Sequence, residues 1–216
     1  MGQKINPRIL RLGAIATWSS RWFAGKNYKD LLLEDFKIRK DLMEKLKGAG
    51  VAEIEIERSI NSLKITAYVS KPGMVIGRGG TGLEDLKAYI QKEFIKKLSS
   101  KKAQYKVDIK VEPIKEPNLN AYLVGKNISE QLIKRLPAKR VLVSTGEKVM
   151  GSGARGIRVV LSGRIGGAEI ARREKIQIGT VPLSTIREDI SYASYPALTK
   201  KGYIGVKVWI HKPEEK

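Results

Sequence analysis

The chain has 216 residues, of which 42 are Lys or Arg and 22 are Asp or Glu, giving a formal net charge of +20 at pH 7. It has no cysteine and one histidine, His211, which excludes disulfides and thiolate metal sites and nearly excludes a histidine triad or multi-histidine metal site. Basic residues outnumber acidic ones by 24 to 14 in residues 1–118 and by 18 to 8 in residues 119–216. Because cations placed on phosphates release counterions, both halves are expected to face a polyanion.

The length allows one large domain or two small ones. No apolar run approaches the roughly 20 residues that span a bilayer. The N-terminal sequence MGQKINPRILRLG lacks the apolar core of a secretory signal and is poor in serine for a transit peptide. We therefore expect a protein of the cytoplasm, or of an organelle matrix after processing.

The first elements along the chain are predicted to be a helix and a β-hairpin. Apolar residues recur at helical spacing over residues 27–47, and two glycines follow. Isoleucine and glutamate then alternate over residues 53–57, and a second alternating run covers residues 63–69. The polar pair Asn61-Ser62 between these runs predicts the turn of a hairpin.

A glycine loop between helices is predicted next. The broken sequence Lys71-Pro72-Gly73 leads through a short helical stretch, residues 74–76, into the glycines of residues 77–80. An amphipathic helix follows, with its apolar stripe from Leu83 to Leu98, and then a strand over residues 105–111. The order is therefore helix, strand, strand, short helix, glycine loop, helix, strand, and two prolines end the unit.

The second half of the sequence, from residue 119, is predicted to form two helices over one antiparallel sheet. A helix begins near Asn118 and stops at Pro137, and a weaker helix covers residues 138–150, because Gly146 disfavours it. The remainder alternates like β-strands at residues 157–162, 174–181, 188–198 and 203–210.

The sequence Gly77-Arg78-Gly79-Gly80 fits the GxxG loop of a KH domain, in which glycines let a sugar-phosphate chain approach closely. Amides of the following helix would face phosphate oxygens, and Arg78 would add a charged contact. The glycines also match a dinucleotide fingerprint through Gly82, but Pro72-Gly73 breaks the strand that this fingerprint needs. A plain glycine-rich turn is the other alternative. The flanking elements favour the KH interpretation.

Three further groups of residues have competing interpretations. The cations of the second half could form a solvated face, but no carboxylate separates those between Ile133 and Ser144, which favours RNA contact. The aromatic side chains near Trp18, Trp22 and Phe23 could stack on bases, although packing is favoured. Polar residues before His211 do not form a catalytic set, so we expect no enzyme activity, no metal and no cofactor.

Four segments resemble one family: GQKINPRILRLG, KPGMVIGRGG, ARGIRVVLSGRIGGAEIARRE and GYIGVKVWIHK. They are similar, over essentially the whole chain, to small-subunit ribosomal protein number three of the bacterial type. The resemblance implies an α+β protein, with an N-terminal type II KH domain of order α-β-β-α-α-β followed by a two-layer α/β domain with an antiparallel sheet. The expected boundaries are a basic extension at 1–16, the KH domain at 17–112, a linker at 113–118, the α/β domain at 119–211 and a tail at 212–216.

The resemblance also implies a role in the head of the small ribosomal subunit, where the family binds ribosomal RNA and lines the tunnel by which messenger RNA enters. Lys139 and Arg140 match a basic pair that contacts incoming messenger RNA and helps to unwind it, although Val143 and Ser144 stand where the family has further cations. Neighbours would be the small-subunit proteins numbered ten and fourteen, with four and five across the entrance. The expected RNA-binding residues are Gly77, Arg78, Gly79, Gly80, Lys4, Arg8, Arg11, Lys134, Arg135, Arg155, Arg158, Arg164, Arg172 and Arg173.

A free-standing KH-type RNA chaperone or ribosome assembly factor is the alternative function, and a nucleotide-dependent enzyme is a third. The third is disfavoured because the sequence has no Walker GxxxxGK[ST] motif.

Overall fold

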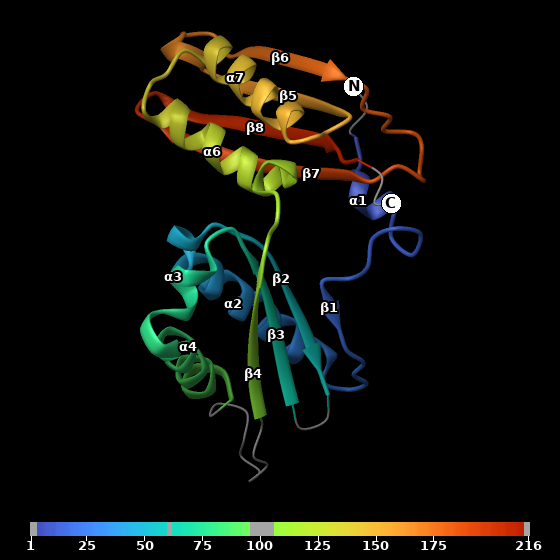
Figure 1. Ribbon diagram of the computed structural model, residues 1–216, viewed down its shortest axis with the longest axis vertical. Helices are drawn as coiled ribbons and strands as arrows, with labels where there is room; N and C mark the ends of the chain where they lie inside the picture. Colours follow the sequence, from blue (N-terminus) through green and yellow to red (C-terminus); the bar gives the residue numbers. More distant parts are fainter. Residues whose placement is uncertain (1–3, 60–61, 96–105, 214–216) are drawn as a thin grey trace. The chain divides into compact units, whose positions relative to one another are not determined.

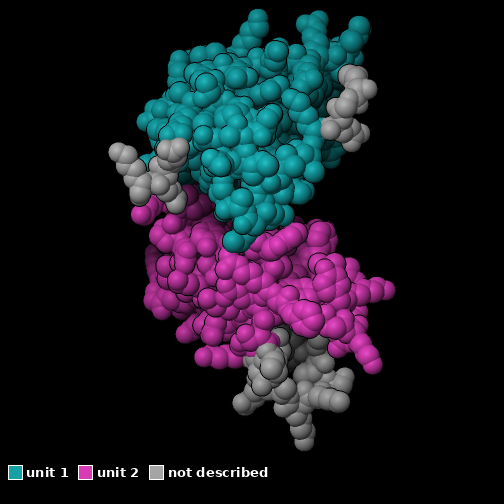
Figure 2. All heavy atoms as spheres, turned by 90° about the vertical axis from the view of Figure 1, so that its right-hand side faces the viewer, with its two compact units in different colours: residues 1–17, 116–216 teal, residues 18–115 magenta. Residues whose placement is uncertain are grey.

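A computed structural model describes residues 4–59, 62–95 and 106–213. The chain divides into two units with separate cores: unit 2 comprises residues 18–115, and unit 1 comprises residues 1–17 and 116–216 (Figure 2). Residues 4–16, part of the segment 1–16 that the sequence analysis expected to be an extension, thus belong to the same unit as the C-terminal half. Among the described residues no helix is long and apolar enough to cross a membrane.

Unit 2 contains the predicted helix, hairpin, short helix, glycine loop, helix and strand in that order (Figure 1). Its sheet has the order β1-β2-β3-β4, in which β2 and β3 are antiparallel and the outer pairings are parallel. Leu98 and Tyr105 lie outside the described residues. The elements are α2 (Tyr28–Lys45), β2 (Val51–Arg58), β3 (Ser62–Val69), α3 (Pro72–Ile76), α4 (Thr81–Ile90) with a π-turn (Gln91–Ile95), β4 (Lys106–Pro113), the short strand β1 (Ser20–Arg21) and a 3-10 turn (Lys47–Ala49).

The alternating residues of β2 and β3 build the core of unit 2. Ile54 and Ile56 are fully buried, and Ile56 pairs across the hairpin with the equally buried Ile65. Helix α2 contributes Ile38 and Leu42, which are one turn apart on one helical face. The pattern of period two in the strands and period 3.6 in the helix therefore produced the packed layers that it predicted.

A buried carboxylate fixes the segment before α2. Asp35, which is 1% exposed, forms an ion pair with Arg58 at 2.6 Å and accepts hydrogen bonds from Trp22 Nε1 at 2.7 Å and Ser20 Oγ at 3.0 Å. Trp22 therefore packs as predicted. The same prediction is wrong for Trp18 and Phe23, which are 68% and 96% exposed. The contacts with Asp35 that hold this segment on α2 come from Ser20 and Trp22.

Unit 1 is a two-layer domain in which α6 (Ala121–Ile133) and α7 (Ala138–Gly151) cover one face of an antiparallel sheet (Figure 1). The strand order is β6-β5-β8-β7, which places the last strand in the interior of the sheet. The strands are β5 (Gly156–Gly163), β6 (Arg172–Gly179), β7 (Ile190–Thr199) and β8 (Gly202–His211), with α1 (Pro7–Leu10) and 3-10 turns at Pro117–Leu119 and Ile165–Gly167.

Helix α7 is continuous, which corrects the expectation that Gly146 would weaken it. Gly146 is buried, and a Cβ placed there would lie 2.6 Å from Ile178 Cδ1 on β6. Thr145 Oγ1 donates to the Val141 carbonyl at 2.7 Å, so its hydroxyl is satisfied inside the helix. Tertiary packing of the helix on the sheet thus overrides the low helix propensity of glycine.

Candidate nucleic-acid interface

The glycine loop of unit 2 joins α3 to α4 in a conformation that requires glycine. Gly77, Gly79 and Gly80 have φ values of 72°, 63° and 86°, in the region that side chains with a Cβ rarely adopt. A Cβ at Gly79 or Gly80 would meet nothing within 4 Å, so the space beside this part of the loop is open. Arg78 is exposed, and its carbonyl accepts from Thr81 Oγ1 at 3.1 Å. The loop is therefore an exposed turn with room for a phosphate chain and a cation beside it.

Gly82 has a different role from the loop glycines. A Cβ there would lie 2.5 Å from the Val75 carbonyl oxygen, so Gly82 permits the close approach of α3 and α4. The element before the loop is α3 and not a strand. Because a dinucleotide fingerprint follows a strand directly, the structure removes that alternative for Gly77, Gly79 and Gly82.

Arg11 was expected to contact RNA, but the structure shows that its side chain is buried. Its side chain is 1% exposed and donates to the carbonyl oxygens of Glu188 (2.6 Å), Thr185 (2.8 Å) and Pro7 (2.9 Å), with longer contacts to Pro182 and Leu183. Burial lowers the pKa of Arg11, against the opposing effect of nearby carboxylates. These hydrogen bonds hold residues 7–11 on the rest of unit 1. Because the guanidinium is buried, it cannot contact a phosphate. Lys4 and Arg8, by contrast, are exposed.

Four predicted cations gather at the turn between α6 and α7. Lys134 and Arg135 lie in the turn itself, and Lys139 and Arg140 lie in the first turn of α7; all four are exposed. Arg135 has a φ of 62°, the one positive value for a residue other than glycine in the described part of the chain. This left-handed residue redirects the chain after α6, so the turn presents its cations together at one end of the helical layer.

The remaining predicted arginines lie in or next to β5 and β6. They differ in whether their guanidinium groups have partners within the protein. Arg172 and Arg173 begin β6 and are exposed. Arg164 donates from Nε to the Ala168 carbonyl at 2.7 Å, and Arg158 lies over the Trp209 ring at 5.5 Å from its centroid. Arg155 is 3.5 Å from a Glu188 oxygen. Arg164, Arg158 and Arg155 therefore have protein partners that compete with a phosphate.

His211 is a structural residue of unit 1. It is 3% exposed, and its ring nitrogens lie 3.0 Å from the Thr180 carbonyl and 2.8 Å from Glu188 Oε2. The hydrogen bond with His211 lowers the pKa of Glu188, assisted by the charges of His211, Arg155 and Arg11 and opposed by partial burial. Within the described residues, no group of three or more His, Asp or Glu side chains is placed to hold a metal ion.

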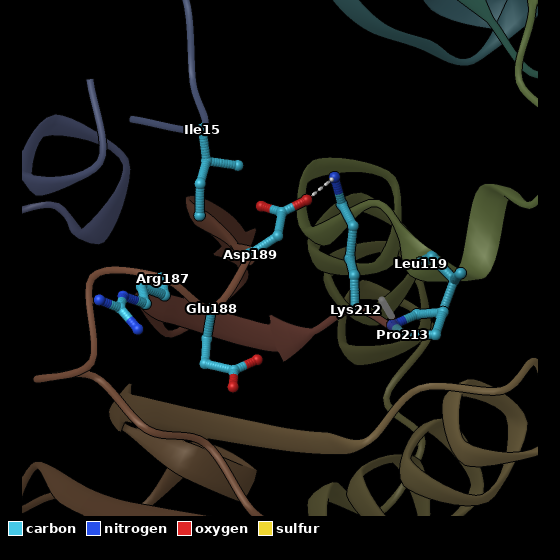
Figure 3. A pocket seen from close by; sticks show the side chains of 7 residues that line it. All are labelled: Ile15, Leu119, Arg187, Glu188, Asp189, Lys212 and Pro213. Atoms are coloured by element: carbon cyan, nitrogen blue, oxygen red, sulfur yellow. Dashed lines mark hydrogen bonds and ion pairs between the residues drawn. The ribbon is translucent and has the colours of Figure 1, made fainter. Parts of the chain in front are cut away.

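A pocket of about 260 Å³ lies beside this pair in unit 1 (Figure 3). Its Lys212 is already paired with Asp189 at 2.7 Å, as the dashed line in Figure 3 shows. The pocket contains none of the residues predicted to bind RNA. It is lined by Ile15, Leu119, Arg187, Glu188, Asp189, Lys212 and Pro213.

Lys207 and Tyr203 of β8, which the sequence analysis did not single out, are exposed. Lys207 is the one charged residue inside an otherwise uncharged strand, β8, before the buried His211. Strand alternation signals the exposure of both residues, since neighbouring positions 204, 206 and 208 are apolar and buried.

Comparison with known proteins adds the identity of the two units. Residues 37–119 match the KH domain family, and residues 128–210 match the family described as ribosomal protein S3, C-terminal domain. Small ribosomal subunit protein uS3 of Desulfitobacterium hafniense is 47% identical over 214 residues, which cover 99% of this chain and 94% of the relative. The same protein of Bacillus anthracis is 47% identical with the same coverage, and that of Clostridium novyi is 44% identical over 215 residues, again 99% of this chain and 94% of the relative. The chain therefore belongs to the uS3 family of small ribosomal subunit proteins.

Proposed function

We propose that the protein is a non-catalytic constituent of the small ribosomal subunit that binds ribosomal RNA. The observation that carries this proposal is the exposed Gly77–Gly80 loop, in which left-handed glycines and Arg78 leave open space for a phosphate chain. The net charge of +20 supports the same partner, because RNA binding by Lys and Arg releases condensed counterions. Its location would be the ribosome, in the cytoplasm.

The proposal extends to messenger RNA at the entrance of its tunnel. Lys139 and Arg140 are exposed at the start of α7, and Lys134 and Arg135 add two more exposed cations at the same turn. A group of cations without an interleaved carboxylate suits a polyanion that passes by without sequence-specific contacts. Val143, which is 45% exposed, offers no charge one turn later, so positioning of the message is better supported than its unwinding.

Protein neighbours are supported by exposed apolar side chains on unit 2. Leu32, Leu33 and Phe36 of α2 are 47%, 48% and 65% exposed, and Trp18 and Phe23 lie in the segment before this helix. Exposed apolar side chains about one turn apart on a helix, as in α2, are typical of protein interaction surfaces. We propose that the small-subunit proteins numbered ten and fourteen adjoin the protein in the subunit head, with numbers four and five across the messenger RNA entrance.

Sedimentation of cell extract on a sucrose gradient tests the ribosomal role. Co-migration of the native protein with the small subunit is expected, whereas a protein that remains at the top of the gradient would indicate the chaperone or assembly-factor alternative.

A loop variant, Arg78→Asp with Gly79→Asp, tests the site. It should keep its thermal stability, because an exposed loop makes few core contacts, and bind a head-region ribosomal RNA transcript more weakly than the parent. Loss of folding would mean that the loop is structural and would remove it as the RNA site.

A further inference from the structure

The sheet of unit 1 has one face that α6 and α7 do not cover. Side chains of successive strand residues alternate between the two faces, and Val159, Leu161, Val206 and Val208 pack into the core beneath the helices. The alternate positions form what we call the open face. They are Arg158, Val160 and Ser162 of β5; Arg173, Lys175 and Gln177 of β6; Tyr192, Ser194, Pro196 and Leu198 of β7; and Tyr203, Gly205, Lys207 and Trp209 of β8.

The charges of the open face have one sign. Arg158, Arg173, Lys175 and Lys207 are its cations, and none of its strand positions is an Asp or Glu. Val160 pairs with Lys175 on one side and with Lys207 on the other, so the two lysines lie two strands apart, at a distance of roughly 10 Å between backbones. Arg173, Lys175 and Lys207 are all exposed. The strand positions of this face therefore carry positive charge and no carboxylate.

The shape of the open face suits an extended polymer. Short side chains occupy one part of it, where Ser162 of β5 pairs with Gly205 of β8. Tyr203, 68% exposed, stands opposite Leu198 at one end. Toward the other end Val160, Ile190 and Trp209 form a buried cluster, and Val181 and Leu183 of the segment before β7 pack against it, so this part of the face is covered. A basic surface with an exposed aromatic ring combines the two features by which single-stranded nucleic acid is bound, charge along the backbone and a ring for stacking.

The turn after β5 repeats the backbone of the glycine loop in unit 2. Gly166 has φ 66° and ψ 10°, whereas Gly79 has φ 63° and ψ 14°, and each is followed by a glycine with a φ of 86°. In both turns the N–H after the two glycines donates to the carbonyl three residues earlier. A Cβ on Gly166, like one on Gly79, would meet nothing within 4 Å. Successive backbone N–H groups in such turns form concavities that bind anions.

We propose that the open face and the Gly166–Gly167 turn form a second RNA-binding surface, which holds the phosphodiester backbone without regard to base sequence. The proposal deepens the function proposed above, because it rests on RNA being the partner and names where unit 1 takes it. Arg173, Lys175 and Lys207 neutralise phosphates, Tyr203 stacks on a base, and the glycine turn receives a phosphate at the end of the sheet. An acidic protein segment would match the charge and the anion-binding turn, but it has no base to stack on the Tyr203 ring.

The experiment compares two variants that lose the same number of charges. The face variant changes Arg173, Lys175 and Lys207 to Ala, and the control variant changes the exposed Lys29, Lys37 and Lys40 of α2 to Ala. Binding of the full-length proteins to a uridine 20-mer and to a head-region ribosomal RNA transcript is measured by fluorescence anisotropy over a series of salt concentrations. Losing three contacts with single-stranded RNA should reduce the log–log salt slope by about 2, since each contributes about 0.7.

A second arm places an aspartate in each glycine turn. Asp tolerates the left-handed conformation better than most residues, so Gly166→Asp and Gly79→Asp should both remain folded while each weakens RNA binding. Gly166→Asn, which adds similar volume without charge, controls for the side chain itself. Acetylation of lysines in the presence of RNA, read by mass spectrometry, should show Lys175 and Lys207 protected and Lys37 unprotected.

The proposal is supported if the face variant binds RNA more weakly and with a smaller log–log salt slope than the parent, while the α2 control matches the parent in both. An equal loss in both variants would overturn it, because affinity would then follow net charge alone. An unchanged face variant beside a failing Gly79→Asp would also overturn it and leave the proposed function standing. Binding of polyglutamate in place of RNA would point to an acidic protein partner and contradict it. Absence of RNA binding by the parent protein would remove the proposed function as well.

Discussion

His211 Nε2 lies 2.8 Å from Glu188 Oε2, and this contact joins the last strand of unit 1 to the segment that receives the N-terminal residues. The Glu188 carbonyl oxygen accepts from Arg11 Nε at 2.6 Å, and the His211 ring also lies 3.0 Å from the Thr180 carbonyl. Glu188 therefore contacts β8 through its carboxylate and the α1 segment through its carbonyl oxygen. Replacing its side chain should lower the stability of unit 1.

The lowered pKa of Glu188 predicts an acid-dependent contribution to stability. Because the folded-state pKa lies below that of an unfolded Glu, near 4.3, the ionised group stabilises the fold above that range. This contribution is lost as the pH falls through the lowered folded-state value. Glu188→Gln should therefore have a lower melting temperature than the parent at pH 7, and the difference should shrink below about pH 4. Glu147→Gln, an exposed change on α7, is the control, and a difference that does not vary with pH would contradict the prediction.

Replacing Arg11 should destabilise the protein although the residue is one of many cations. Its guanidinium is buried and donates to several carbonyls, and removing it would leave those acceptors unsatisfied. We expect Arg11→Ala to cost roughly 2–4 kcal/mol in urea unfolding, from lost charged hydrogen bonds, and Arg11→Lys to recover little, because an ammonium lacks the planar fork. The exposed Lys4 of the same segment, changed to Ala, should stay within about 0.5 kcal/mol of the parent. Equal effects at the two positions would show that Arg11 has no special structural role.

Gly82 should tolerate no side chain, in contrast to Gly73 in the neighbouring helix. A Cβ on Gly82 would lie 2.5 Å from the Val75 carbonyl oxygen, so Gly82→Ala forces α3 and α4 apart and should cost about 1–3 kcal/mol. The change should also weaken RNA binding, because these helices hold the glycine loop. A Cβ on Gly73 meets nothing within 4 Å, so Gly73→Ala should be neutral or slightly stabilising. Thermal melts of the two variants make the comparison, and a stable Gly82→Ala would disprove the close-packing argument.

Changing Lys139 and Arg140 to Ala tests the proposed contact with messenger RNA. Adjacent residues on a helix point about 100° apart, so both reach one strand only through their long side chains. Subunit assembly should be unaffected, since many other cations contact ribosomal RNA in the proposal. Translation of a structured message should slow relative to an unstructured one, and less than in a relative with further cations, because Val143 supplies none. Equal rates on both messages for variant and parent would argue against an unwinding role.

Much of the fold was predictable because periodicity is a local property of the chain. The alternation around Ile54 and Ile56, and the spacing of Ile38 and Leu42, indicated which faces would be buried before any partner element was known. The family was likewise indicated by short segments, and the matches over residues 37–119 and 128–210 confirm it. Gly146 shows where local reasoning failed, since its place in α7 depends on Ile178, a residue of β6.

The role of each cation was decided only by the tertiary structure. The sequence determined the charge of +20, the glycine loop and the order of the elements, all of which depend on residue type and near neighbours. It could not distinguish Arg11 from Arg8, because the carbonyls that enclose the Arg11 guanidinium come chiefly from residues 182–188, more than 170 positions along the chain. Nor could it place Lys175 and Lys207 on one face, which follows from the pairing of β5 with both β6 and β8. A long flexible side chain takes its role from what surrounds its charged end, and only the folded chain brings those surroundings together.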